Sequence, residues 1–384
     1  MLYLNILKVF KRHKVMELVN NDGQAKVLAF YLPQFAPTEL NDKYYGKGFT
    51  EWTNVGKAKP LFRGHYQPKV PADLGYYDLR VPEVAIQQAE LANKAGVFGF
   101  AYWHYWWSGD MELEKPAEWM LETRRPDFPF CFAWANENWY KKLWSKDKKD
   151  DILIKDQQYP GEADNRAHFD YCLPFFRDSR YITYDGRPVF LIYRPLLFAA
   201  VSGFINQWNE LIKEAGVAER FYFVGMMYRS DELEQLKALG FDCVTPQHNL
   251  RALSDNPGVF GQMKSHLQAF LGRNGMLRKY NYAKYPSTVW DDGCDSRDDV
   301  APQLIPNWDN TPRAGRRGLL YTNATPEVFG KAANRVMQEV KKKNNKLVFL
   351  KSWNEWAEGN YMEPDLRYGH GFIDALGKAV RESV

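Results

Sequence analysis

Two carboxylates near the C-terminus are the strongest candidates for chemistry. Glu355 and Glu358 lie three residues apart, directly after the apolar run 347–352. Cleavage of a glycosidic bond needs one carboxyl group that protonates the leaving oxygen and another that acts at the sugar. A tight turn after a buried strand would bring both side chains to one side of a pocket, where each carboxylate raises the pKa of the other. We predict that they form the catalytic pair. The alternative is that one only anchors the loop, with Glu137 as its substitute.

Aromatic residues with amide or carboxylate neighbours recur along the chain. The sequence is 16% aromatic, with 13 Trp, 23 Tyr and 24 Phe, and flat sugar faces stack on such rings while polar groups bind the hydroxyls. A single aromatic residue is more often part of a core, but the repetition of the pattern indicates a sugar site. The residues predicted to bind substrate are Tyr31, Glu51, Trp52, Trp103, His104, Tyr105, Trp106, Asn136, Glu137, Trp139, Tyr193, Arg194, Asp309, Thr311, Arg313, Trp353, Asn354 and Trp356.

Short apolar runs alternate with longer helix-compatible segments, which is typical of parallel βα units. Eight runs are candidate strands: 26–31, 97–103, 130–134, 188–193, 221–227, 242–245, 303–307 and 347–352. Several are almost continuously hydrophobic, as strands buried on both faces are. Together they predict a (β/α)₈ TIM barrel, in which the carboxyl ends of all strands meet at one rim. The polar and aromatic clusters follow the predicted strand ends, so the same rim is the predicted active site.

The segments between the strands complete the expected organisation. Helices are predicted over 81–95, 203–215 and 326–343, because proline near the start and Gly or Lys near the end match helix polarity. The stretches 32–78 and 251–299 lack periodicity and are expected to be long loop excursions at the C-terminal face of the strands, where long loops are usually functional. We find no repeat or linker that divides the chain. One catalytic domain is therefore expected over 25–384.

Composition argues against several classes of protein. The net charge is +4 and the charges are scattered, which disfavours a nucleic-acid partner. The four cysteines, Cys131, Cys172, Cys243 and Cys294, are far apart and form no zinc-ligand pattern, so free thiols are expected. Three of them lie in apolar or strand-like runs, where burial is expected. The acidic loop 291–299 lacks the spacing of a calcium loop, and a solvated loop is the favoured interpretation. His104 has no potential ligand at metal-binding spacing. No metal and no cofactor are expected.

Residues 1–24 are expected to be a leader outside the barrel. Its apolar residues precede its basic ones, which is the reverse of a secretory signal. Residues 1–14 can form an amphipathic helix that would lie on an anionic membrane surface, but a packed or frayed leader is the favoured alternative. No apolar run is long enough to span a bilayer. A cytoplasmic or membrane-peripheral location is expected.

Several of these segments together resemble one known family. The segments 30–35, 48–52, 100–106, 134–137 and 352–359, followed by Glu363 and Pro364, are similar to those of WbsX-type proteins. That family is often labelled as glycosyltransferases of lipopolysaccharide biosynthesis, and it is related to the endo-α-mannosidases of glycoside hydrolase family 99. The likeness covers about residues 27–372. In the mannosidases the last motif reads Asn-Glu-Trp-His-Glu-Gly, and Ala357 replaces its histidine here.

The resemblance implies a retaining mechanism with separate roles for the two carboxylates. Glu355 would take the proton of the sugar 2-hydroxyl and give a 1,2-anhydro intermediate, while Glu358 would be the general acid and then the general base. Asp309, Thr311 and Arg313 resemble the matching substrate site of the seventh strand. Because the 2-oxygen must attack opposite the leaving group, α-linked mannose or rhamnose glycans are the expected substrates.

Two other classes of function remain as alternatives. A glycosyltransferase of surface-polysaccharide synthesis would use a nucleotide-sugar donor, but the sequence has neither a G-x-G-x-x-G loop nor an Asp-x-Asp pair. The lack of a secretion signal favours the transferase, since enzymes that degrade polysaccharides are often exported. A sugar-binding protein without catalysis is disfavoured by the intact carboxylate pair. The leading hypothesis is a glycoside hydrolase that acts on an oligosaccharide or polysaccharide.

Overall fold

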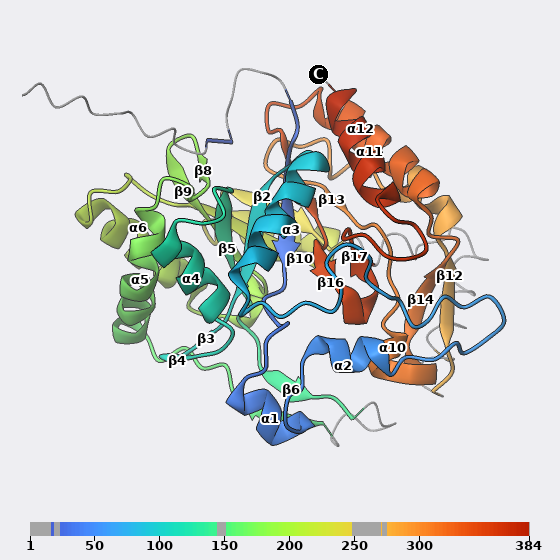
Figure 1. Cartoon of the computed structure of the whole chain (residues 1–384). Coiled ribbons are helices and arrows are strands. Elements are labelled where there is room, and N and C mark those ends of the chain that lie inside the picture. Colours follow the sequence, from blue (N-terminus) through green and yellow to red (C-terminus); the bar gives the residue numbers. More distant parts are fainter. Residues whose placement is uncertain (1–16, 19–23, 144–150, 248–269, 271–274, 384) are drawn as a thin grey trace, which may run out of the picture.

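The computed structural model describes residues 17–18, 24–143, 151–247, 270 and 275–383, and its centre is a barrel of parallel strands (Figure 1). Its eight strands are β1 (Lys26–Tyr31), β2 (Val97–His104), β5 (Phe130–Trp134), β9 (Arg187–Ile192), β10 (Tyr222–Met227), β11 (Cys243–Pro246), β13 (Gln303–Leu304) and β15 (Leu347–Leu350). Each coincides with one of the predicted apolar runs. The predicted fold class, a (β/α)₈ TIM barrel, is confirmed.

The strands follow one another around the barrel in chain order. The hydrogen-bonded order is β11-β10-β9-β5-β2-β1-β15-β13, and all of these pairings are parallel. The ring is nearly closed between β11 and β13 by a parallel bridge from Val244 to Val300. Val244 donates to the carbonyl of Asp299 and accepts from the amide of Ala301, both at 2.9 Å. The carboxyl ends of the strands therefore meet at one rim.

Helices cover the outside of the barrel with their apolar faces turned inward. They are α3 (Pro82–Lys94), α4 (Lys115–Thr123), α5 (Glu162–Phe176), α6 (Val201–Glu214), α7 (Leu233–Ala238), α9 (Tyr285–Thr288), α11 (Pro326–Val340) and α12 (Gly371–Arg381). The predicted polarity is present in α11, where the Thr325 hydroxyl caps the amide of Val328 and Pro326 follows it. Helices α11 and α12 pack together on one flank, and α5 packs on α6 on the other (Figure 1).

Short elements follow the carboxyl ends of the strands. They are α1 (Glu39–Tyr45), α2 (Glu51–Gly56), β3 (Trp106–Trp107) with β4 (Asp110–Met111), β6 (Trp139–Lys141) with β7 (Ile152–Lys155), α10 (Thr311–Ala314), and β16 (Asn354–Glu355) with β17 (Asn360–Tyr361). Three further short strands are β8 (Thr183–Tyr184), which pairs with β9, and β12 (Arg278–Asn281), which pairs with β14 (Leu319–Thr322). Helices α1, α2 and α10 lie near β6 at the lower side of the molecule in Figure 1. The predicted excursion 32–78 thus contains two helices of the rim.

The predicted leader lies almost entirely outside the described residues, as do residues 248–269 of the second excursion. Within the leader, Leu18 is buried and its amide donates to the carbonyl of Thr183 at 2.8 Å. Its neighbour Glu17 accepts hydrogen bonds from the amides of Asp185 and Gly186. The start of the described chain therefore packs on the β8–β9 turn. The membrane contact expected for residues 1–14, and the single domain expected over 25–384, stay predictions.

The acidic loop 291–299 is tied to the barrel more closely than expected. Asp295 is fully buried, and the Nζ of Lys343 donates to its backbone carbonyl at 2.7 Å. The carboxylate of Asp298 accepts from the backbone and side chain of Asn344. Most of the loop is nonetheless solvent-accessible, as predicted, since Asp292, Ser296 and Asp298 are exposed. Asp295 is a buried exception, and these contacts hold the approach to β13 against the segment before β15. All four cysteines are free, as predicted, and all four are buried. None of the helices in the described ranges is both long and apolar enough to cross a membrane.

Candidate active site

A cavity of about 810 Å³ opens at the carboxyl ends of the barrel strands. This volume is within the range of small-ligand sites, about 300–1,000 Å³. Ten of the predicted site residues line it: Glu51, Trp103, Tyr105, Asn136, Glu137, Trp139, Tyr193, Arg313, Glu355 and Glu358. They come from six places in the chain, the first and last of which are more than three hundred residues apart. The structure therefore brings together both predicted catalytic residues and eight of the eighteen predicted substrate-binding residues.

One guanidinium group joins the two candidate catalytic carboxylates. The Nη2 of Arg313 donates to Glu355 Oε1 at 2.7 Å, and its Nη1 donates to Glu358 Oε1 at 2.8 Å. Its Nε donates at 3.1 Å to a third carboxylate, that of Glu51. Arg313 is supplied by α10 after the seventh strand and Glu51 by the first turn of α2. Since three acids surround one cation, the cluster carries an excess of negative charge when all are ionised.

Burial distinguishes the two carboxylates. The side chain of Glu355 is 10% exposed and that of Glu358 is 25% exposed. Burial raises the pKa of Glu355 to about 8; Arg313 opposes this rise, and the negative charges of Glu358 and Glu51 add to it. Glu355 therefore holds a proton in the free protein at neutral pH. A carboxyl group with such a pKa can both give and take a proton near neutrality.

Buried groups fix the turn that carries Glu355 and Glu358. Glu355 ends β16, and a single 3₁₀ turn, Trp356–Glu358, carries Glu358 next to it. The Nε1 of Trp356 donates to the carboxylate of Glu363 at 2.6 Å, and the ring of Trp356 stacks on Tyr361. Burial raises the pKa of Glu363 to about 7. These contacts explain why the turn holds its shape.

Gly359 ends this turn in a conformation that other residues adopt poorly. Its φ is +63°, and a Cβ atom built there would lie 2.9 Å from the backbone nitrogen of Asp309. That nitrogen donates to the carbonyl of Glu358 at 2.6 Å and so anchors the acid. The close approach of two backbones leaves no room for a side chain.

Gly359→Ala is expected to lower the free energy of unfolding by more than about 1 kcal/mol, because it adds backbone strain and a contact with backbone. It is also expected to lower kcat, since Glu358 moves with the turn. Chemical denaturation and steady-state kinetics measure the two effects. Gly203→Ala is a matched control, since Gly203 lies in α6 with open space around it. Equal stability of the two variants would contradict the role of Gly359.

Parallel aromatic rings form one wall of the cavity. Tyr105 stacks with Trp107 at 5.7 Å between ring centroids and with Trp139 at 5.9 Å, with interplanar angles of 25° and 20°. Beside them, Asn136 is locked: its Oδ1 accepts from the amide of Arg194 and its Nδ2 donates to the hydroxyl of Tyr159. Flat rings beside a fixed amide are suited to a sugar face and its hydroxyls.

The other predicted substrate-binding residues do not line the cavity. Three of them are buried in the core: Tyr31, Trp353 and Trp356. The side chain of Asn354 accepts a hydrogen bond from the amide of Leu32 and donates one to its carbonyl. The indole of Trp52 donates to the carbonyl of Tyr77. The predicted substrate-binding residues that do not line the cavity are Tyr31, Trp52, His104, Trp106, Arg194, Asp309, Thr311, Trp353, Asn354 and Trp356. We attribute supporting roles to Tyr31, Trp52 and Asn354, because their polar atoms are engaged with other parts of the protein.

Asp309 is a further supporting residue. Its carboxylate accepts from His65 Nε2 at 2.9 Å, from Gln67 Nε2 at 2.8 Å and from the hydroxyl of Thr311 at 2.6 Å. These bonds hold the pKa of Asp309 below its usual value despite burial. Asp309 is therefore ionised and saturated. It connects the excursion after β1 to the turn below Glu358.

Several cavity residues were absent from the prediction. Gln34, Tyr45, Phe49, Asn54, Trp107, Asn138, Tyr159 and Lys351 line the cavity, together with Lys57, Lys141 and Lys142. Gln34, Phe49, Trp107 and Asn138 lie within or beside the segments that were singled out, so the strand-end argument applied to them as well. Tyr45, Asn54 and Lys57 come from α1, α2 and the loop after them. No local pattern marks those residues as facing a cavity.

Comparisons with known proteins agree on one family and one fold. The family model described as "Glycosyltransferase WbsX" matches residues 27–376. Two proteins from strains of Xanthomonas campestris pv. campestris, each described as "Uncharacterized protein WxcX", are 34% identical over 371 residues, or 93% of this chain and 50% of their own length. The chain thus spans about half the length of these relatives.

Solved structures with a similar fold were found at low sequence identity. A "Glycoside hydrolase-like protein" matches with a TM-score of 0.59 and 15% identity over 94% of this chain and 95% of its own. The GH99 endo-α-mannosidase from Bacteroides thetaiotaomicron, in complex with bis-tris-propane, matches with a TM-score of 0.54 and 14% identity over 93% and 96%. At these identities the likeness is one of fold.

Proposed function

Because the chain belongs to the WbsX glycosyltransferase family, we propose that it is a carbohydrate-active enzyme and that its reaction is the hydrolysis of an α-linked glycan with retention of configuration. The observation that carries the proposal is the pair Glu355 and Glu358, bridged by Arg313 in a cavity with an aromatic wall. Retaining hydrolysis needs two adjacent carboxyl groups of different protonation state. One structural neighbour is an endo-α-mannosidase, which supports the substrate class.

The difference in burial supports separate roles for the two acids. The ionised form of Glu355, the more buried acid, takes the proton of the 2-hydroxyl while O2 bonds to C1. In the same step Glu358, the more exposed, gives its proton to the leaving oxygen as the glycosidic bond breaks. Water then gives a proton to Glu358 and attacks C1, and O2 recovers its proton from Glu355. No charge or proton is left over. A carboxylate whose conjugate acid has a raised pKa is the stronger base for the hydroxyl.

This mechanism restricts the sugar. The 2-oxygen must approach C1 from the face opposite the leaving group, as it does in α-mannosides and α-rhamnosides. In an α-glucoside the 2-hydroxyl is on the same face as the leaving group, and the intermediate cannot form. We therefore propose a mannose- or rhamnose-configured glycan, with oligosaccharide or polysaccharide as the partner.

Aryl α-mannoside, α-rhamnoside and α-glucoside of equal leaving group test this proposal. We expect release from a manno-configured substrate at least about 10²-fold faster than from the glucoside, because only the former can use the base at its 2-hydroxyl. NMR of the first-formed product should show the α-anomer. Preference for the glucoside, or a β-anomer formed first, would contradict the mechanism.

A glycosyltransferase is the second candidate. The description of the family favours it, and so do three lysines at the cavity, Lys57, Lys141 and Lys142, which can contact a diphosphate group. A transferase of this kind should be stabilised by a nucleotide sugar. Thermal unfolding with a panel of nucleotide sugars separates the two candidates: a rise in Tm together with silence on every α-manno substrate would favour transfer.

A further inference from the structure

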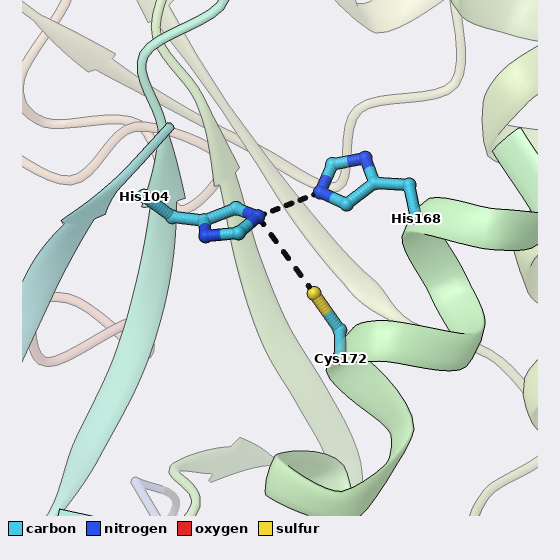
Figure 2. A group of neighbouring side chains, drawn as sticks. All are labelled: His104, His168 and Cys172. Atoms are coloured by element: carbon cyan, nitrogen blue, oxygen red, sulfur yellow. Dashed lines mark hydrogen bonds between the residues drawn. The ribbon is translucent and has the colours of Figure 1, made fainter. Parts of the chain in front are cut away.

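A second group of reactive side chains lies behind the aromatic wall and outside the cavity. His104 ends β2, while His168 and Cys172 lie one turn apart on α5 and so face the same way. Figure 2 shows the three side chains pointing toward one another across the gap between strand and helix. All three are buried, with exposed fractions of 5%, 1% and 0%. Sequence spacing gives no metal-binding partner for His104, because His168 and Cys172 are more than sixty residues away.

The donor atoms of the three side chains converge. His104 Nε2 lies 2.8 Å from His168 Nε2 and 3.9 Å from Cys172 Sγ, and all three donor atoms lie within 4.8 Å of one another. Neutral imidazole and thiolate are the forms that bind metal ions. Within the described ranges, no other cluster of three or more His, Cys, Asp or Glu has this compactness.

These distances are close to those of a bound transition ion. Bonds of about 2.0–2.1 Å to nitrogen and about 2.3 Å to sulfur place two nitrogens about 3.3–3.6 Å apart and nitrogen and sulfur about 3.6–3.8 Å apart. The separation of His104 Nε2 from Cys172 Sγ, 3.9 Å, is slightly longer than this range. The two imidazoles must separate by roughly half an ångström, which side-chain rotation can supply. We propose that His104, His168 and Cys172 form a structural site for one thiophilic d¹⁰ cation, Cu⁺ or Zn²⁺.

The surroundings favour an ion with few ligands. His104 stacks on Phe132, and His168 stacks on Trp106 and meets the edge of Trp208. Burial of net charge among such groups is costly. Cu⁺ with one thiolate and two neutral imidazoles has no net charge and needs only three ligands, whereas Zn²⁺ would leave one positive charge and usually takes a fourth ligand. Between the two ions the structure favours Cu⁺.

Binding of the cation releases one proton from the protein. The metal–sulfur bond replaces the S–H bond of Cys172, and that proton leaves to solvent. The histidine that donates through Nε2 in the free protein changes to its Nδ1–H tautomer, so its imidazole keeps the same number of protons. The ion would join α5 to the end of β2, where the carbonyl of His104 accepts from the amide of Ala135 at 2.9 Å. Its position next to Tyr105 makes it a brace for the aromatic wall.

Metal content after loading with each ion tests the site. Protein produced with added Zn²⁺, or with copper under reducing conditions, is freed of loosely bound metal and measured by inductively coupled plasma mass spectrometry. We expect about one equivalent of copper in the wild type and at least about a tenfold loss in Cys172→Ala, since loss of even an outer partner of a ligand costs about 10–100-fold in affinity. Cys131→Ala is the matched control, because Cys131 is also a fully buried free thiol but lies outside the cluster.

A measurement on the wild type covers the case in which Cys172→Ala fails to fold. X-ray absorption of the loaded protein should show one sulfur at about 2.3 Å and two nitrogens at about 2.0 Å from the metal. Zinc in place of copper with the same ligands supports the site and changes the ion. Less than a tenth of an equivalent of both ions, equal retention by Cys172→Ala and Cys131→Ala, or absorption spectra without a sulfur ligand would overturn the proposal.

Discussion

Glu355→Gln is expected to lower kcat/KM by about 10²–10⁴-fold while glycan binding is retained, because glutamine keeps the shape and the acceptor for Arg313 but cannot take a proton. Glu358→Gln is expected to have a comparable effect. The control is Glu90→Gln, an exposed change on α3. Kinetics on the best aryl substrate and calorimetric titration with a glycan measure both quantities. A Glu355→Gln variant that retains more than about a tenth of the activity would remove this residue from catalysis.

The same substitution has a consequence for stability that depends on pH. The pKa of Glu355 is about 8 in the folded protein, above the 4.5 that is usual for a glutamate. Because the folded protein holds this proton more tightly than the unfolded chain does, protonation of Glu355 stabilises the folded state. This contribution is complete below the pKa of the unfolded chain and is lost as pH rises through the pKa of the folded protein. Wild type should therefore lose stability relative to Glu355→Gln between about pH 4.5 and 8. Thermal unfolding at pH 5 and pH 9 measures this effect. The Tm of the variant minus the Tm of the wild type should be larger at pH 9 than at pH 5.

The pH dependence of activity checks the same assignment independently. If Glu355 must be ionised to accept the 2-hydroxyl proton, kcat/KM of the wild type should rise with pH through about 8. A rise that ends near pH 5 would mean that a carboxyl with an ordinary pKa is the base. In that case the roles of Glu355 and Glu358 would have to be exchanged or reassigned.

Arg313→Met is expected to have the largest effect on the site as a whole. It removes the only guanidinium bound to Glu51, Glu355 and Glu358 among the described contacts. Breaking a buried ion pair by removal of one partner typically costs about 3–5 kcal/mol. Since the side chain of Arg313 is 23% exposed, we expect about 3 kcal/mol at pH 9. The cost should be smaller at pH 6, where Glu355, with its raised pKa, can hold a proton instead.

Urea denaturation at both pH values measures this change, and Arg316→Met is its control. Arg316 lies three residues further along the same segment and is exposed, so its replacement should alter neither stability nor activity. Loss of the positive charge should also move the alkaline rise of kcat/KM to higher pH, because Arg313 opposes the raised pKa of Glu355. An unchanged pH profile in an active Arg313→Met would show that the arginine does not act on the base.

Much of the fold was predictable because barrel strands carry a strong local signal. The eight apolar runs coincide with the eight strands, since strands buried on both faces need continuous hydrophobic residues. The order of the strands followed from chain order, as expected for parallel βα units. Glu355 and Glu358 were predictable for the same reason: three residues of one turn keep them together whatever surrounds them. The largest difference is in the weak run 303–307, which is three residues longer than its strand, Gln303–Leu304.

The direction of each side chain was decided by the tertiary structure. From Trp103 to Trp106 the chain alternates: Trp103 and Tyr105 line the cavity, while His104 and Trp106 pack outward against His168 of α5. In a strand with one face in solvent, this alternation shows in the sequence as alternating polar and apolar residues. Here both faces of the strand are covered, and both carry aromatic residues. The sequence therefore placed all four residues in the sugar site, and only the packing of α5 separated them.

The sequence by itself determined the barrel, the rim and the pair of acids, because each depends on residues that are close in the chain. Only the tertiary structure joined Glu51 and Arg313 to that pair, and His104 to His168 and Cys172. Those contacts span from 42 to 262 residues along the chain, and no local pattern records them. The charge environment that sets the pKa of Glu355 belongs to the same class, since burial and neighbouring charges exist only once the chain has closed around it.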